Sequence, residues 1–73
     1  MKTKLGAFFD DRSINRAEIA RKTGISNQRL SELSNNSSAN LRADELYLIA
    51  LSLGINPCSL LDLLCRHLNL NGL

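Results

Sequence analysis

The chain is poor in several kinds of residue that mark specialised folds. Among its 73 residues there is no tryptophan, one tyrosine, two phenylalanines and one proline. Hydrophobic residues still make up 44% of the chain, so the core is predicted to consist mainly of Leu and Ile. The apolar residues recur at helical spacing and are interrupted by charge, and no segment resembles a membrane span or a signal peptide. We therefore expect a cytoplasmic protein that does not enter a membrane.

Cysteine is scarce as well, and its spacing argues against chemistry at the thiols. Cys58 and Cys65 are seven residues apart in a predicted helix, which separates their Cα atoms by about 10 Å, too far for an intrachain disulfide. His67 would point to a different side of that helix. No group of His, Cys, Asp and Glu combines a nucleophile, a base and an orienting residue. We expect no metal, no cofactor and no enzymatic activity, and we interpret the cysteines as small core or interface residues.

The net charge of +2 is small, so its distribution matters more than its size. Residues 12–36 contain five basic and two acidic side chains, an excess of three positive charges. Residues 37–73 contain two basic and three acidic side chains, and the first eleven residues balance. The positive charge is therefore concentrated in one part of the chain, as it is in proteins that bind an anionic partner.

The length predicts one domain over residues 1–73, with a modest core and marginal stability in the absence of a partner. Apolar spacing and capping residues predict an all-α fold with five helices. Thr3, Asn15, Ser26 and Asn56 are the expected N-caps. Glu18 completes a capping box with Asn15. The expected helices cover about 3–11, 16–23, 27–34 and 43–53, and the last runs from 57 to near 67.

The predicted helices share one apolar core. The residues expected in it are Leu5, Phe8, Phe9, Ile19, Ile25, Leu30, Leu33, Leu46, Ile49, Ala50, Leu53, Leu60, Leu61, Leu64 and Leu68. Further apolar residues are left over on the last two helices and the tail. Exposed apolar patches on small proteins often mark partner surfaces, so we expect a homodimer. The residues assigned to its interface are Leu63, Cys65, Leu68, Leu70 and Leu73. The alternative is that the surplus simply wraps the core.

Residues 16–33, RAEIARKTGISNQRLSEL, have the pattern of two short helices joined by a tight turn. Ala20 is small where a second helix would cross, and Gly24 falls where the first helix must end. Asn27 and Gln28 follow the Ser26 cap, and their amide side chains are suited to hydrogen bonding with base edges. This spacing is typical of a helix-turn-helix that binds DNA. A helical domain that merely shares the geometry remains the alternative.

Over about residues 5–64 the chain resembles the lambda repressor and Cro family of phage and bacterial regulators. The resemblance rests on INRAEIARKTGIS, NQRLSEL and LRADELYLIALSLGINPCSLL, taken in this order and spacing. It implies a compact five-helix fold with the helix-turn-helix at the second and third helices. It also implies sequence-specific binding of a two-fold symmetric site on double-stranded DNA by a dimer, with repression of transcription as the expected effect.

The resemblance further implies roles for individual residues. Base-contacting positions would be Asn27, Gln28, Ser31 and Glu32. Phosphate-contacting positions would be Arg16, Arg29, Asn35, Asn36 and Arg42, with a guanine as a second possible target for Arg29. A different use of the same fold is an antitoxin that binds a toxin protein. The six residues of the tail offer little of the extended segment that an antitoxin brings to its toxin.

Two departures from the family pattern fall on one interaction. Many members carry an Arg late in the first helix that pairs with a Glu just after the recognition helix, and this chain has Phe9 and Ser34 there. Losing both partners of a buried pair can be nearly neutral, so the fold prediction stands. In addition, Asn36 replaces the usual Gly after the recognition helix, and it adopts a left-handed backbone less easily.

Overall fold

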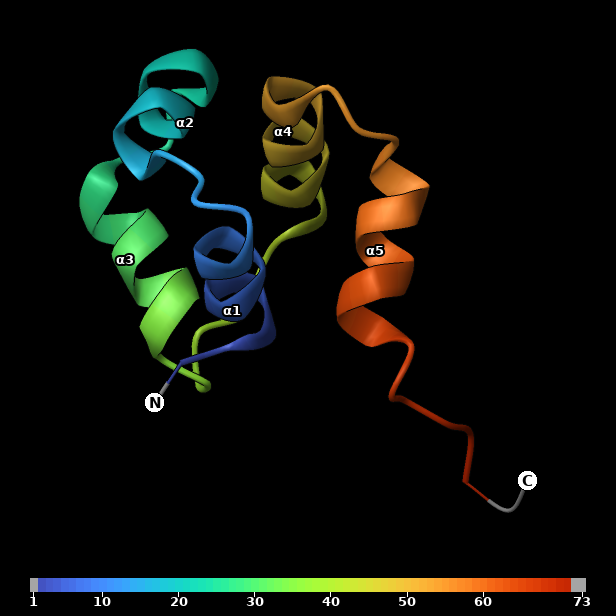
Figure 1. Ribbon diagram of the computed structural model, residues 1–73. Helices are drawn as coiled ribbons and strands as arrows, with labels where there is room; N and C mark the ends of the chain where they lie inside the picture. The colour runs from blue at the N-terminus through green and yellow to red at the C-terminus, as the bar shows by residue number, and fades with distance from the viewer. Residues whose placement is uncertain (1, 72–73) are drawn as a thin grey trace.

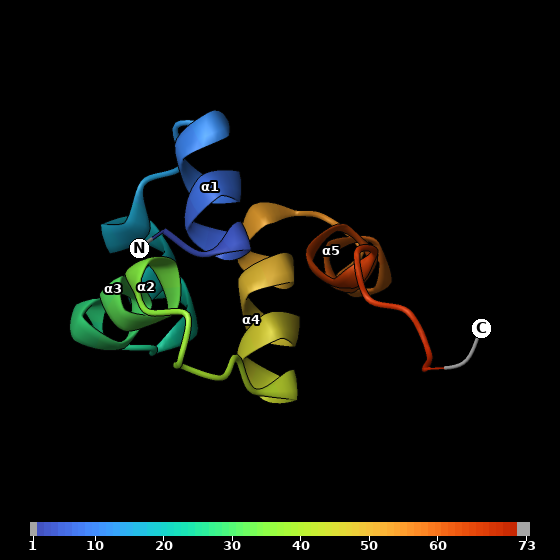
Figure 2. The ribbon, with the colours of Figure 1, turned by 90° about the horizontal axis from the view of Figure 1, so that it is seen from below.

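A computed structural model describes residues 2–71 and contains five α-helices within them. They are α1 (Lys4–Asp11), α2 (Arg16–Thr23), α3 (Asn27–Asn35), α4 (Ala43–Leu53) and α5 (Pro57–Cys65). Figure 1 shows α2 and α3 on one side of the molecule and α5 on the other, with α1 and α4 between them. In Figure 2 the chain beyond α5 leads away from the other helices. The prediction of an all-α fold with five helices is confirmed.

Local capping accounts for most of the helix ends. The side chains of Thr3, Asn15 and Ser26 accept hydrogen bonds from backbone amides three residues later, and Asn56 accepts one from the Cys58 amide. Gly24 and Gly54 end α2 and α4 with φ angles of 81° and 70°, in the left-handed region where glycine costs least. The Glu18 carboxylate turns to Arg21, so the predicted capping box is formed only by its Asn15 half.

Two helix ends differ from the predictions. Helix α3 continues one residue further, to Asn35, and α5 stops at Cys65 and does not reach His67. Beyond α5 the Leu68 amide donates to the Cys65 carbonyl oxygen at 2.9 Å. This bond spans three residues and not the four of an α-helix, so a tight turn closes α5 early.

The predicted core forms, with two corrections, one on α5 and one just beyond it. Phe9, Leu30, Ile49, Ala50 and Leu60 each expose 1% or less of their surface. Leu61 and Leu68, in contrast, are 50% and 64% exposed, so their assignment to the core was wrong. Leu61 is rotated by about 100° from Leu60 around the helix, and Leu68 lies beyond the end of α5. The surplus apolar surface of the protein is therefore larger than the sequence suggested.

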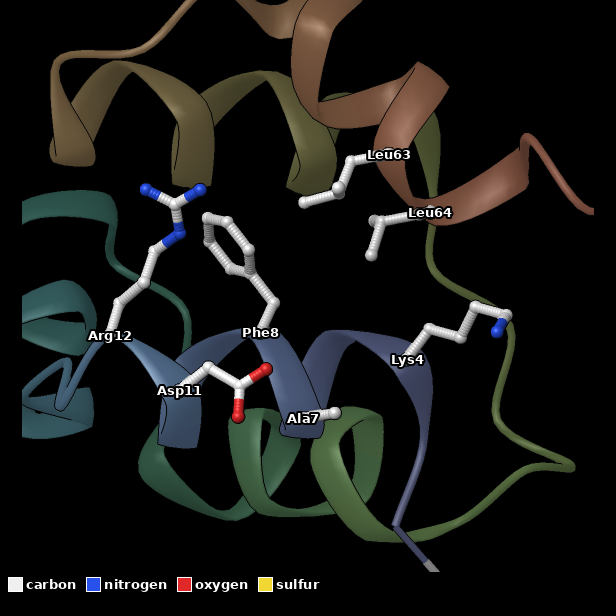
Figure 3. A pocket seen from close by; sticks show the side chains of 7 residues that line it. All are labelled: Lys4, Ala7, Phe8, Asp11, Arg12, Leu63 and Leu64. Carbon is white, nitrogen blue, oxygen red and sulfur yellow. The ribbon is translucent and has the colours of Figure 1, made fainter.

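A pocket of about 430 Å³ lies between α1 and α5. Figure 3 shows Leu63 and Leu64 of α5 on one side of it and Phe8 of α1 on the other. The Arg12 guanidinium lies over the Phe8 ring, 4.7 Å from its centre, as in a cation–π contact. Helix α5 thus meets α1 through a few long side chains, and it packs mainly against α4.

Within residues 2–71 no single helix is long and apolar enough to cross a membrane. Helices α4 and α5, bent by 117° at their junction, pass that test of length and composition only when taken together.

The start of the chain is bound to the end of α3. The Thr3 amide donates to the Ser34 carbonyl oxygen at 2.9 Å, and the Thr3 hydroxyl donates to the Leu33 carbonyl oxygen at 2.6 Å. In the first turn of α1, a Cβ atom built on Gly6 would clash with the same Ser34 carbonyl oxygen. Gly6 therefore permits an approach of α1 to α3 that any other residue would block.

We predict that Gly6→Ala destabilises the protein. Alanine favours helix by about 0.5–1 kcal/mol over glycine, but forcing a methyl group against a backbone oxygen costs about 1–3 kcal/mol. The free energy of unfolding, measured by urea denaturation, should therefore fall. Asp11→Ala is the control, because this exposed position on the same helix offers the propensity gain without the clash. A Gly6→Ala protein as stable as the control would contradict the close approach.

Candidate nucleic-acid interface

Helix α3 has one polar face and one buried face. Leu30, Leu33 and Ser34 expose between 0% and 3% of their surface. The opposite positions, spaced one turn apart, are all exposed: Asn27, Gln28, Ser31, Glu32 and Asn35. The side-chain amide of Asn35 donates to the Ser31 carbonyl oxygen at 3.0 Å. All four residues predicted to contact bases therefore share one accessible face.

The turn before α3 has the geometry of a helix-turn-helix. Helix α2 ends at the left-handed Gly24, and the Ser26 hydroxyl caps α3 by accepting from the Arg29 amide at 3.1 Å. Ile19 of α2 and Leu30 of α3 are buried in the same core, and Ile25 of the turn packs against it. The first turn of α3 is thus presented at the end of a short, rigid connection.

The Arg16 side chain contacts Phe9 and Ser34, the two residues that stand where many family members have an Arg–Glu pair. Its Nε donates to the Ser34 hydroxyl at 3.2 Å, and its guanidinium lies 5.4 Å from the centre of the Phe9 ring. Its Nη2 also pairs with Asp10 at 3.2 Å. A basic side chain from α2 therefore joins α1 to the buried end of α3 across the two substituted positions. The side chain is still 35% exposed.

Asn36, which replaces the usual Gly after the recognition helix, does not adopt a left-handed backbone conformation. Its φ and ψ are −115° and 107°, an extended conformation open to any residue. Its side-chain oxygen accepts from the Ser38 amide at 2.9 Å, which orders the start of the segment between α3 and α4. Replacing glycine by asparagine thus carries no backbone strain here.

At the other end of that segment, Arg42 is well exposed. Its side chain is 69% exposed and pairs with Asp44, itself 62% exposed, at 3.1 Å. An exposed pair of this kind contributes little to stability. The Arg42 guanidinium is therefore the most accessible of the three arginines assigned to phosphates.

Arg29 has partners that the sequence did not reveal. Its Nε lies 2.9 Å from Glu45 Oε2, and its Nη2 lies 3.0 Å from Glu45 Oε1. The Nη2 group also donates to the Asn40 carbonyl oxygen at 2.8 Å. Glu45, on the first turn of α4, is 8% exposed. The pair is therefore a two-bond bridge between α3 and α4 at a shielded position.

Glu45 also organises the start of α4. Its Oε1 accepts from the Arg42 backbone amide at 3.0 Å, which satisfies a donor just before the helix. The hydrogen bonds from Arg29 lower the pKa of Glu45 below its ordinary value and outweigh the opposing effect of burial. The sequence held a signal for part of this role, since Glu45 stands three residues after Arg42, the N-cap residue of α4. No sequence signal indicated its bond to Arg29, which lies 16 residues away.

Among residues 2–71 no three His, Cys, Asp or Glu side chains lie close enough together to hold a metal ion. Cys58 is exposed and Cys65 half-buried, and both are free thiols. Of the residues assigned to the dimer interface, Leu63 and Cys65 are half-buried and Leu68 and Leu70 are exposed, while Leu73 lies outside the described residues.

The two helices, the tight turn and the polar face define a helix-turn-helix DNA-binding domain. Comparison with family models agrees: the Cro/C1-type helix-turn-helix DNA-binding domain matches residues 4–65. The chain belongs to this family, which confirms the predicted resemblance. Comparisons with curated proteins and with solved structures gave no match.

We predict an acid-dependent contribution of Glu45 to stability. Because its pKa is lower in the folded protein, its carboxylate stabilises the fold above its ordinary pKa, and this stabilisation is lost as the pH falls through the folded value. Glu45→Gln should therefore lower the free energy of unfolding by about 1–3 kcal/mol at pH 7, because hydrogen bonds to a charged group are lost.

The difference between the two proteins should narrow as the pH falls below the ordinary Glu pKa of 4.5, where the unfolded chain first takes up the proton, and it should disappear once the folded carboxylate is protonated at a lower pH. Glu18→Gln removes a carboxylate from an exposed ion pair on α2 and serves as the control, with a small effect at either pH. A Glu45→Gln deficit that is equal at pH 3 and pH 7 in denaturation curves would contradict the assignment.

Proposed function

We propose that the chain is a sequence-specific transcriptional regulator that binds a two-fold symmetric operator as a homodimer and represses transcription. The observation that carries this proposal is the polar face of α3, which places Asn27 and Gln28 at the exposed start of the second helix of a helix-turn-helix. In such domains the first residues of that helix enter the major groove. For this role the protein would be encoded by a bacterium or phage and would act in the cytoplasm, where the DNA is.

The proposed contacts divide into two kinds. Asn27 and Gln28 hydrogen-bond to base edges, for which adenine is the best match because an amide can both donate to it and accept from it. Ser31 and Glu32, one turn further along, face the same groove. The proposed phosphate contacts are Arg16 on α2, Asn35 at the end of α3, and Asn36 and Arg42 in the segment between α3 and α4. Contacts of the second kind set the register of the protein but carry no sequence information.

The proposed dimer uses α5 and the residues after it. Leu61, Leu68 and Leu70 are between 50% and 74% exposed, so α5 and the residues after it each present apolar side chains to water. Burying a Leu side chain is worth about 1.5–3 kcal/mol, which supplies a driving force for association. In Figures 1 and 2 this stretch lies on the side of the molecule away from α3, so the proposed interface leaves the recognition helix open.

A random-oligonucleotide selection with the purified protein should return a site with two inverted halves. Two recognition helices that enter successive major grooves on one face of DNA require half-sites roughly 34 Å, or 10 base pairs, apart. Sedimentation equilibrium should show a dimer at the concentrations used. A single unpaired half-site with a monomer would refute the dimer. A failure to select any sequence would refute the regulator and favour a protein-binding role, such as that of an antitoxin.

Substitutions should separate base contacts from phosphate contacts. Gln28→Ala should cost about 1–3 kcal/mol of binding at the selected site and relax selection at one or two base pairs, without changing the salt dependence. Arg42→Gln should weaken binding to selected and scrambled DNA alike and reduce the salt slope by about one. Both residues are exposed, so thermal unfolding should be nearly unchanged.

Fluorescence anisotropy across a series of salt concentrations measures both effects. If Gln28→Ala kept full sequence selection while Arg42→Gln altered it, the assignment of α3 as the recognition helix would be wrong.

A further inference from the structure

Arg29 stands on the first turn of α3, between Gln28 and the fully buried Leu30. Helix α3 packs against α1 and α2 through its apolar face. The Arg29 side chain connects α3 by hydrogen bonds to α4 and to the segment that precedes α4. That segment contains Asn36 and Arg42, which we have proposed to lie at the DNA backbone. The side chain thus joins the two parts of the proposed interface.

We propose that Arg29 is a positioning residue for DNA recognition: through Glu45 and the Asn40 carbonyl oxygen it fixes the first turn of α3 relative to the 36–42 segment and α4, and it does not itself bind a phosphate or a base. This inference rests on the proposed function, and it assigns to Arg29 a different role from the one that the family resemblance implies.

The geometry of the guanidinium supports this role. Three hydrogen bonds of 2.8–3.0 Å engage Nε and Nη2 with Glu45 and with the Asn40 carbonyl oxygen. Nη1 lies 3.9 Å from a carboxylate oxygen of Glu32 on α3 itself. The Arg29 side chain is 29% exposed, compared with 69% for Arg42. Its planar fork of donors is therefore largely occupied inside the protein.

The charge balance points the same way. If Arg29 bound a phosphate, the Glu45 carboxylate would lose its partner. The Glu45 side chain is only 10% exposed, and an uncompensated buried charge is strongly unfavourable. In its present place the positive charge of Arg29 is already neutralised by Glu45. It therefore releases few DNA counterions, and counterion release is what gives a phosphate contact its salt dependence.

A positioning role has a different signature from a purely structural one. Loss of the bridge lets the first turn of α3 shift relative to the 36–42 segment, which spoils the alignment of Asn27 and Gln28 with base edges. Binding to scrambled DNA depends on the general positive surface and does not need that alignment. Selectivity should therefore fall without a loss of nonspecific binding. A lower folded fraction, in contrast, would weaken binding to both kinds of DNA by the same factor.

The test uses the full chain and two duplexes of equal length and base composition, one selected with the unmodified protein and one scrambled. Fluorescence anisotropy across a salt series gives the affinity ratio of the two duplexes and the salt slope. The variants are Arg29→Met, which removes the charge, Arg29→Lys, which keeps the charge but loses the fork, and Glu45→Gln. Glu18→Gln is the matched control, because it also removes one negative charge from an Arg–Glu pair but one that lies within α2.

We expect Arg29→Met, Arg29→Lys and Glu45→Gln each to lower the affinity ratio about tenfold, with scrambled-DNA binding within about twofold of the unmodified protein and an unchanged salt slope. Glu18→Gln should leave the ratio unchanged. Circular dichroism at the assay temperature monitors folding. A loss that is equal on both duplexes marks a structural role and overturns the inference.

A direct phosphate contact would also overturn it. In that case Arg29→Met would reduce the salt slope by about one, Arg29→Lys would retain selectivity, and Glu45→Gln would bind more tightly than Glu18→Gln because it frees the guanidinium. If the unmodified protein shows no preference between the duplexes, the proposed function fails and the inference fails with it. If that preference is intact and the variants keep it, only the inference fails.

Discussion

Leu30 and Ser34 lie one turn apart on α3, and neither exposes any surface. Their burial fixes the rotation of α3 about its axis, because the core and the Thr3 and Gly6 contacts accept only that face. The opposite face must then point to water, and it carries amides, a hydroxyl and a carboxylate in place of apolar groups. The face proposed to bind DNA is thus a consequence of how the other side of the same helix is packed.

Charged side chains complete what the apolar core begins. Arg16 connects α2 to the Ser34 hydroxyl, and Arg29 connects α3 to Glu45. Both bridges involve partners that are shielded from water, so they help to fix the positions of the helices that they join. Arg42, by comparison, pairs with Asp44, an exposed aspartate close by in sequence. Three arginines that look alike in a sequence therefore differ in how freely each can meet a phosphate.

The sequence predicted what depends on neighbouring residues. Thr3, Asn15, Ser26 and Asn56 cap helices as expected, because a cap involves residues two or three positions apart. The early end of α5 and the exposure of Leu61 and Leu68 were missed, because apolar spacing alone does not tell which leucines find a partner surface.

The polar face of α3 was also predicted, since it follows from helical spacing. The bonds of Arg16 to Ser34 and of Arg29 to Glu45 were not, because these partners lie 18 and 16 residues away and no local pattern links them. Gly6 was likewise overlooked: its need for close approach to Ser34 exists only once α1 and α3 are packed together. The exposure of the residues proposed to contact bases could thus be predicted from the sequence, while the contacts that support their helix could not.

We have proposed that the exposed face of α3 binds DNA. The most direct measurement is nuclear magnetic resonance of ¹⁵N-labelled protein titrated with a selected duplex, following both the backbone amides and the side-chain amides of Asn27 and Gln28. We expect the largest shift changes in the first turns of α3 and in the 36–42 segment, with the two side-chain amides among them. Changes concentrated on α5 and the α1–α5 pocket, with α3 unaffected, would contradict this proposal.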